Sequence, residues 1–251
     1  MRWALLSDIH ANWHALEACL QHARNLGAQN HAVLGDLVGY GAYPAEVVTQ
    51  VAHMRAQGAV VLRGNHDQPL VGPSSPQAGS MAAATAGWTW AQLDDRAVAF
   101  LVGLPLTAHL GNVVLAHASA DQPERWIYVD NAPKAARCWQ AAHQLGSTQG
   151  VFVGHVHHQH LYYPGADHKM MGFAPTAGVP IPLRRNRGFV ATVGSVGQPR
   201  DGDTRAMYAT YDDQTLQLAF HRVPYDHMAA AAAVRRVGLQ EVFAARLEAG
   251  R

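Results

Sequence analysis

The stretch Trp3-Ala4-Leu5-Leu6-Ser7-Asp8-Ile9-His10 joins a short apolar run to a polar triplet that carries a carboxylate and an imidazole. The same pattern recurs along the chain, with an apolar run leading into polar residues each time. The later polar segments are Gly35-Asp36, Gly64-Asn65-His66-Asp67, His117 and Gly154-His155-Val156-His157. Short apolar runs bounded by turn residues are typical of buried strands. The pattern therefore predicts strands whose carboxyl ends each present polar side chains.

Helical patterns lie between these runs. The apolar runs span residues 3–6, 32–34, 59–62, 113–116 and 151–153. The helices are expected from Trp13 to before Gly27, from Pro44 to before Gly58, near 92–102 and near 133–145. Strands that alternate with helices indicate a largely parallel sheet, in which ligands bind beyond the carboxyl ends of the strands. We therefore expect the polar segments to lie together at one edge.

The second part of the chain has a different texture. Residues 158–187 contain Gly, Pro and Arg with little periodicity, which predicts a long loop or hairpin over the site. Runs at 189–193, 206–211 and 216–223 predict antiparallel strands of a second sheet, and residues 226–247 predict a helical tail. At 251 residues the chain is interpreted as one domain spanning 1–251.

Composition narrows the class of protein. The formal net charge of +1 argues against bulk attraction to nucleic acid, although it allows a local basic pocket. The two cysteines, Cys19 and Cys138, both fall in helical patterns, so we expect free thiols and a reducing compartment. No apolar run approaches the roughly 20 residues that span a bilayer. These features predict a cytoplasmic protein without membrane partners, and they leave open a homo-oligomer.

The polar segments share one kind of chemistry. Carboxylate oxygens and imidazole nitrogens are the ligands that borderline divalent cations prefer. Taken alone, Asp8 could cap a helix, and residues 64–67 could form a tight turn. Together the five segments favour a metal site. Two adjacent sites could be completed by these residues, with Asp36 as the carboxylate that bridges them.

The same segments resemble the sequence blocks of the calcineurin-like metallophosphoesterases, namely Asp-x-His, Gly-Asp, Gly-Asn-His-Asp, a lone His and Gly-His-x-His. This match spans roughly residues 4–157, and residues 35–41 and 194–203 resemble further blocks of small bacterial and archaeal members. The resemblance implies an α/β fold, a two-sheet β-sandwich flanked by helices in α-β-β-α layers. It also implies two divalent ions, such as Mn, Fe or Zn, with Mn favoured.

The resemblance further implies a role for each site residue. One ion would be held by Asp8, His10, Asp36 and His157, and the other by Asp36, Asn65, His117 and His155. His66 would face the scissile phosphate, and Asp67 would fix the tautomer of His66. The chain departs from the family pattern at Ala118, because glycine often follows the lone histidine and alanine restricts the backbone more.

The activity implied is hydrolysis of a small phosphorylated molecule by a hydroxide that bridges the two metals. A nucleotide phosphodiesterase is favoured, and a phosphomonoesterase or a dinucleoside polyphosphate hydrolase is the nearest alternative. A non-catalytic scaffold is disfavoured because the expected ligands and His66 are all present. Arg200, which has Gly197 and Gly202 close by, is expected to grip a substrate phosphate. Tyr40 and Tyr43 could stack on a base or sugar, or only pack against the protein.

Overall fold

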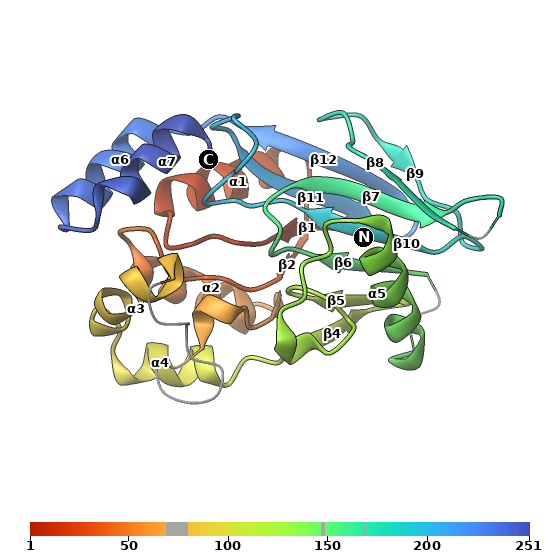
Figure 1. Cartoon of the computed structure of the whole chain (residues 1–251), viewed down its shortest axis with the longest axis horizontal. Helices are drawn as coiled ribbons and strands as arrows, with labels where there is room; N and C mark the ends of the chain where they lie inside the picture. Colours follow the sequence, from red (N-terminus) through yellow and green to blue (C-terminus); the bar gives the residue numbers. More distant parts are fainter. Residues whose placement is uncertain (69–79, 147–148, 168) are drawn as a thin grey trace.

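Two sheets packed face to face form the centre of the molecule. The computed structural model describes residues 1–68, 80–146, 149–167 and 169–251. Within these residues each sheet has six strands, and helices lie on both outer faces (Figure 1). The α/β fold with α-β-β-α layers is therefore confirmed.

The first sheet has the strand order β3-β2-β1-β11-β12-β9. Its parallel part comprises β1 (Arg2–Leu6), β2 (Asn30–Val33) and β3 (Val60–Val61). Its antiparallel part comprises β11 (Ala206–Asp212), β12 (Gln217–Val223) and β9 (Ile181–Pro182). The parallel strands are joined by crossover helices, α1 (Trp13–Asn25) and α2 (Pro44–Ala56).

The second sheet has the strand order β4-β5-β6-β10-β7-β8. Three of its strands are parallel, namely β5 (Val113–Ala116), β6 (Gly150–Val153) and β10 (Phe189–Val193). The others are antiparallel to their neighbours, namely β4 (Thr107–Leu110), β7 (Gln159–Pro164) and β8 (Met170–Phe173). Helix α5 (Ala132–Gln144) covers the outer face of this sheet.

Strand pairing corrects two predictions. The five early strands do not form one parallel sheet, because β1 to β3 belong to one sheet and β5 and β6 to the other. The later runs do not form a second sheet of their own: β11 pairs with β1, and β10 lies parallel to β6. Apolar patterning identifies the buried faces of a strand but not its neighbour, and β1 is buried on both faces.

Helices with an apolar stripe along one face form close to where the sequence predicts them. The pattern near residues 92–102 becomes α4 (Asp95–Val102), which Asp94 caps by accepting from Ala97 N. Helix α3 (Met81–Ala91) was not predicted, because its alanine-rich sequence has little polar contrast between faces. The predicted helical tail forms two helices, α6 (His227–Arg236) and α7 (Glu241–Ala249). Among the described residues, no helix combines the length and apolar character that crossing a bilayer requires.

The segment 158–187 contains regular structure. Its residues form the β7–β8 hairpin at the edge of the second sheet and the short strand β9 of the first (Figure 1).

Aromatic side chains fill the space between the two sheets. The ring of Phe152 on β6 lies 5.1 Å from that of Phe189 and 5.2 Å from that of Tyr211 in the opposite sheet. All three are almost completely buried. Because both sheets end at the same edge, this packing fixes where their carboxyl ends meet.

We predict that Phe152→Ala lowers the free energy of unfolding by about 3–5 kcal/mol, since it leaves a cavity between the sheets. Phe173→Ala is the matched control, because Phe173 on β8 is 39% exposed, and it should cost less than about 1 kcal/mol. Urea denaturation of both variants checks this. Equal losses would show that the space between the sheets is not the main core.

Candidate metal centre

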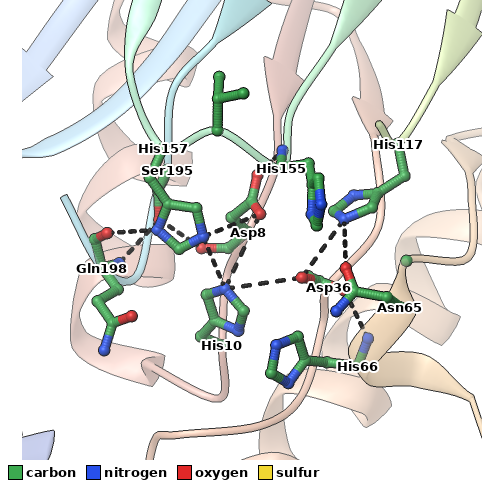
Figure 2. A network of polar contacts seen from close by, with 12 residues as sticks. Asp8, His10, Asp36, Asn65, His66, His117, His155, His157, Ser195 and Gln198 are labelled. Carbon is green, nitrogen blue, oxygen red and sulfur yellow. Dashed lines mark hydrogen bonds and ion pairs between the residues drawn. The ribbon is translucent and has the colours of Figure 1, made fainter. Parts of the chain in front are cut away.

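The predicted polar segments meet at the carboxyl ends of parallel strands. Asp8 and His10 follow β1, Asp36 follows β2, and residues 65–67 form a 3₁₀ turn after β3. From the second sheet, His117 follows β5, and residues 155–157 follow β6. Figure 2 shows these side chains pointing toward one another from both sheets. Neighbouring strand ends thus bring residues that are far apart in the sequence into one cluster.

His10 and His157 present bare nitrogens to each other. Each ring donates its Nδ1 hydrogen to a backbone carbonyl, at 3.2 Å to Val38 O and 2.6 Å to Gln198 O. Nε2 of each ring is then an acceptor, and the two Nε2 atoms lie 3.1 Å apart (Figure 2). Asp8 Oδ1 lies 3.2 Å from Nε2 of His157. Acceptors held this close call for a cation between them.

A second set of potential metal ligands lies beside the first. His117 donates its Nδ1 hydrogen to Leu34 O at 2.8 Å, which leaves Nε2 facing two oxygens. That nitrogen lies 3.2 Å from Asn65 Oδ1 and 3.4 Å from Asp36 Oδ2. His155 completes the set, since ligand atoms of Asp8, Asp36, His117 and His155 all lie within 4.8 Å of one another.

Two buried atoms of the cluster have no hydrogen-bond partner within the described part of the chain. They are Asp8 Oδ1 and His155 Nε2. A buried polar atom without a partner costs about 1–3 kcal/mol, so such atoms call for a ligand. The donor set therefore fits metal binding by its chemistry as well as by its spacing.

Asp36 lies between the two sets. Its Oδ2 is 3.8 Å from His10 Nε2 and 3.4 Å from His117 Nε2. Burial by itself would raise the pKa of Asp36, but the neighbouring imidazoles, His117 foremost, hold that pKa well below its usual range. Burial by itself would lower the pKa of His117, but Asp36 raises it to about 9. Asp36 thus favours positive charge on the His117 side, whereas burial holds the pKa of His10, on its other side, well below its usual range.

The backbone of the cluster is strained. Left-handed φ angles occur at Asp8 (53°), His10 (49°), Asp36 (53°), His155 (64°) and His157 (58°). Residues other than glycine rarely adopt this conformation, and each instance costs roughly 1–3 kcal/mol. Such strain is concentrated at functional sites, where it aims side chains that an ordinary strand end would point elsewhere.

His66 and Asp67 lie at the edge of the cluster. The backbone N–H of His66 donates to Asp36 Oδ1 at 2.8 Å, and its ring packs against those of His10 and Tyr40. Burial lowers the pKa of His66. A nitrogen of His66 also lies close enough to His10 and Asp36 to ligate a cation with them.

Asp67 is hydrogen-bonded to the backbone. Its carboxylate accepts from the backbone N–H groups of Leu37, Val38 and Gly64, at 2.8, 3.3 and 2.9 Å. In the described ranges it makes no hydrogen bond to His66, so these contacts do not support a role in fixing the His66 tautomer. Asp67 instead ties the loop after β2 to the turn that carries His66.

The predicted substrate residues have different surroundings. Tyr40 is buried against His10 and His66. Tyr43 points its hydroxyl to Arg236, which donates to it at 2.9 Å. Arg200 is half-buried and donates to Gln198 Oε1 at 3.2 Å. Tyr40 and Arg200 therefore border the cluster, while Tyr43 is engaged with α6.

Sequence reasoning missed the aromatic segment that precedes α5. The ring of Trp126 lies 5.8 Å from that of His117, and the ring of Tyr128 stacks on His155 at 3.9 Å. No motif surrounds these residues, so only their aromatic character could have drawn attention to them. Ala118 is buried without a left-handed φ, so alanine meets the backbone requirement after His117.

Comparison with known proteins assigns the family. The model of the calcineurin-like phosphoesterases matches residues 1–159. A curated protein from Methanocaldococcus jannaschii, called uncharacterized protein MJ0912, is 31% identical over 99% of this chain and 98% of its own length. The chain belongs to the calcineurin-like phosphoesterase family. This phosphoesterase is therefore a hydrolase of phosphate esters, and its buried Asp and His groups fit the divalent metals that the family uses.

Two solved structures are similar to this phosphoesterase over the whole chain. A metallophosphoesterase from Sphaerobacter thermophilus is 33% identical with a TM-score of 0.86, and the match covers 100% of both chains. A hypothetical protein from Pyrococcus horikoshii is 19% identical with a TM-score of 0.76, over 100% of this chain and 98% of that one. The second likeness concerns the fold alone.

We predict that Asp36→Asn removes most of the bound metal, because the amide loses the charge that faces both sets of histidines. Asp95→Asn is the matched control, since Asp95 is exposed in the first turn of α4. Elemental analysis after loading with Mn checks both variants. Full metal content in Asp36→Asn would contradict the central place given to this carboxylate.

We predict that Gly154→Ala displaces Asp8 and so weakens metal binding. A Cβ at Gly154 would lie 1.8 Å from Ser7 Oγ and 2.6 Å from Asp8 Oδ2. The variant should lose about 1–3 kcal/mol of stability and bind less metal. Gly87→Ala in α3 is the control, because a Cβ there meets no atom within 4 Å. Thermal unfolding and elemental analysis measure the two effects. An unchanged melting temperature and metal content in Gly154→Ala would refute the packing argument.

Proposed function

We propose that this phosphoesterase is a dinuclear-metal-dependent nucleotide phosphodiesterase, with Mn as the favoured ion. The observation that carries the metal part is the pair of facing acceptor sets, with Asp36 between them. Asp8, His10, Asp36 and His157 would hold one ion. Asp36, Asn65, His117 and His155 would hold the other.

Two divalent ions in these positions would lower the pKa of a water and neutralise charge on the phosphate. The protein's own groups would do the rest. His66, beside Asp36 and half-buried, would face the scissile phosphate, where it would stabilise charge on the oxygens or protonate the leaving oxygen. Arg200 would donate to the phosphate oxygens.

The preference for a diester rests on resemblance. Residues 35–41 and 194–203 resemble blocks of small bacterial and archaeal family members, which often cleave phosphodiesters. A phosphomonoesterase and a dinucleoside polyphosphate hydrolase remain the alternatives, and a non-catalytic scaffold is disfavoured by the complete set of acceptors.

The remaining proposals concern the setting of the enzyme. A small-molecule substrate is proposed because the cluster is buried rather than spread over an open surface. A cytoplasmic location is proposed because Cys19 and Cys138 are buried free thiols, which fit a reducing compartment.

The deciding experiment is a substrate screen. Mn-loaded protein should hydrolyse bis-p-nitrophenyl phosphate and nucleotide diesters faster than p-nitrophenyl phosphate and dinucleoside polyphosphates. Asp36→Asn should remove the activity. Faster monoester turnover would replace the diesterase proposal, and equal background rates in both proteins would favour the scaffold.

We predict that His66→Gln lowers kcat by about 10²–10⁴-fold, the range expected for loss of a general acid. Metal content should stay near that of the wild type, because the facing acceptor sets do not need His66. Elemental analysis and steady-state kinetics measure the two effects separately. Loss of metal together with activity would instead make His66 a ligand alongside His10 and Asp36.

A further inference from the structure

Tyr128 covers one half of the metal centre. Its ring stacks on that of His155 with a centroid distance of 3.9 Å and an interplanar angle of 25°. The residue is nevertheless 45% exposed, unlike the ligands beneath it. Trp126 packs on His117 in the same half. Tyr128 is therefore at the mouth of the site, between the buried ligands and solvent.

Tyr40 borders the other half. Its ring lies 4.6 Å from that of His10, 4.5 Å from that of His66, and 5.5 Å from that of Phe243 on α7. Tyr40 is 7% exposed, so little of its ring is open for a base to stack on. Its hydroxyl is the one polar group of the side chain and is therefore the group that can bind a ligand.

Burial raises the pKa of Tyr40 to about 12 and also raises the pKa of Tyr128, and the positive charge of Arg200 opposes the rise in both. Arg200 forms no ion pair with a carboxylate in the described residues, whereas Arg205, Arg222 and Arg235 all do. Its Nε is buried without a hydrogen-bond partner in the same part of the chain.

The hydrogen-bonding capacity of this group is directional. A guanidinium carries donors only, so a tyrosine hydroxyl beside Arg200 can accept from it and keep its own hydrogen to donate elsewhere. Arg200 donates a hydrogen bond to the side-chain oxygen of Gln198, and the backbone carbonyl of Gln198 accepts one from His157. The group thus offers several donors beside the metal centre, and a ligand rich in acceptor oxygens would satisfy them.

We propose that Tyr40, Arg200 and Tyr128 form an oxyanion-binding site at the mouth of the metal centre, which takes the non-bridging oxygens of a phosphate group. This rests on the proposed function, and it deepens it by giving Tyr40 and Tyr128 defined roles. A phenol ordinarily keeps its hydrogen at neutral pH, so both hydroxyls can act as donors. Tyr43 is not included in the site, because its hydroxyl lies against Arg236 of α6.

Binding of inorganic phosphate to the Mn-loaded protein tests the proposal by calorimetry. Tyr128→Phe and Tyr40→Phe each remove a hydroxyl and keep the ring that packs on the histidines. Each should weaken phosphate binding about tenfold, as expected for one hydrogen bond to a charged group. Metal content should not change. The matched control is Tyr163→Phe, because Tyr163 also faces an arginine, Arg187 at 4.5 Å, but on the β7–β8 hairpin.

The outcomes separate this proposal from the proposed function. Phosphate binding requires no turnover. Failure to hydrolyse any ester would therefore refute the proposed phosphodiesterase activity and leave the binding measurement valid. Wild-type affinity in both phenylalanine variants would overturn the oxyanion site. Loss of metal in Tyr128→Phe would overturn it too, by showing that the hydroxyl supports His155 rather than a ligand. In kinetics, the supporting result is a higher KM with kcat changed by less than about threefold.

Discussion

The arrangement of the strand ends depends on one constraint, the close approach of the ring nitrogens of two histidines. His10 and His157 each commit one ring nitrogen to a carbonyl, and their other nitrogens lie 3.1 Å apart with an aspartate oxygen beside them. Such an arrangement is unfavourable in the protein alone. Left-handed backbone at five of the clustered residues adds further strain. The cost must be offset elsewhere, and the apolar packing between the two sheets is the large favourable term available.

The same constraint joins the two sheets. Each proposed ion would draw ligands from both, since Asp8 and His10 follow a strand of one sheet and His157 a strand of the other. For the other ion, Asp36 and Asn65 follow strands of the first sheet, and His117 and His155 follow strands of the second. A ligand that binds only the folded state stabilises it by mass action. Metal binding would therefore stabilise the contact between the sheets as well as supply the chemistry.

Sequence reasoning reached the residues that cluster at the strand ends but not the neighbours of the strands. Asp8, Asp36 and His117 could be nominated because each directly follows an apolar run, a local signal. The pairing of β11 with β1 could not, because it depends on which free edge is nearest once both sheets have packed. Tyr128 was missed for a related reason: it meets His155 only through the fold. Asp67 shows the converse, since its motif was recognised while its partners proved to be backbone groups.

The proposed metal ligand His157 and the proposed phosphate contact Arg200 are both held by the loop after β10. The Gln198 carbonyl accepts from His157, and the Gln198 side chain accepts from Arg200. Ser195 in the same loop donates to Asp8 O and accepts from Gln198 N. Any change that moves this main chain will alter a proposed metal ligand, His157, and a proposed phosphate contact, Arg200, together. The two functions can be separated experimentally only by changes that remove a single polar atom and leave the loop in place. A phenolic hydroxyl at the mouth of the site meets that requirement, whereas truncation of Gln198 or Ser195 does not.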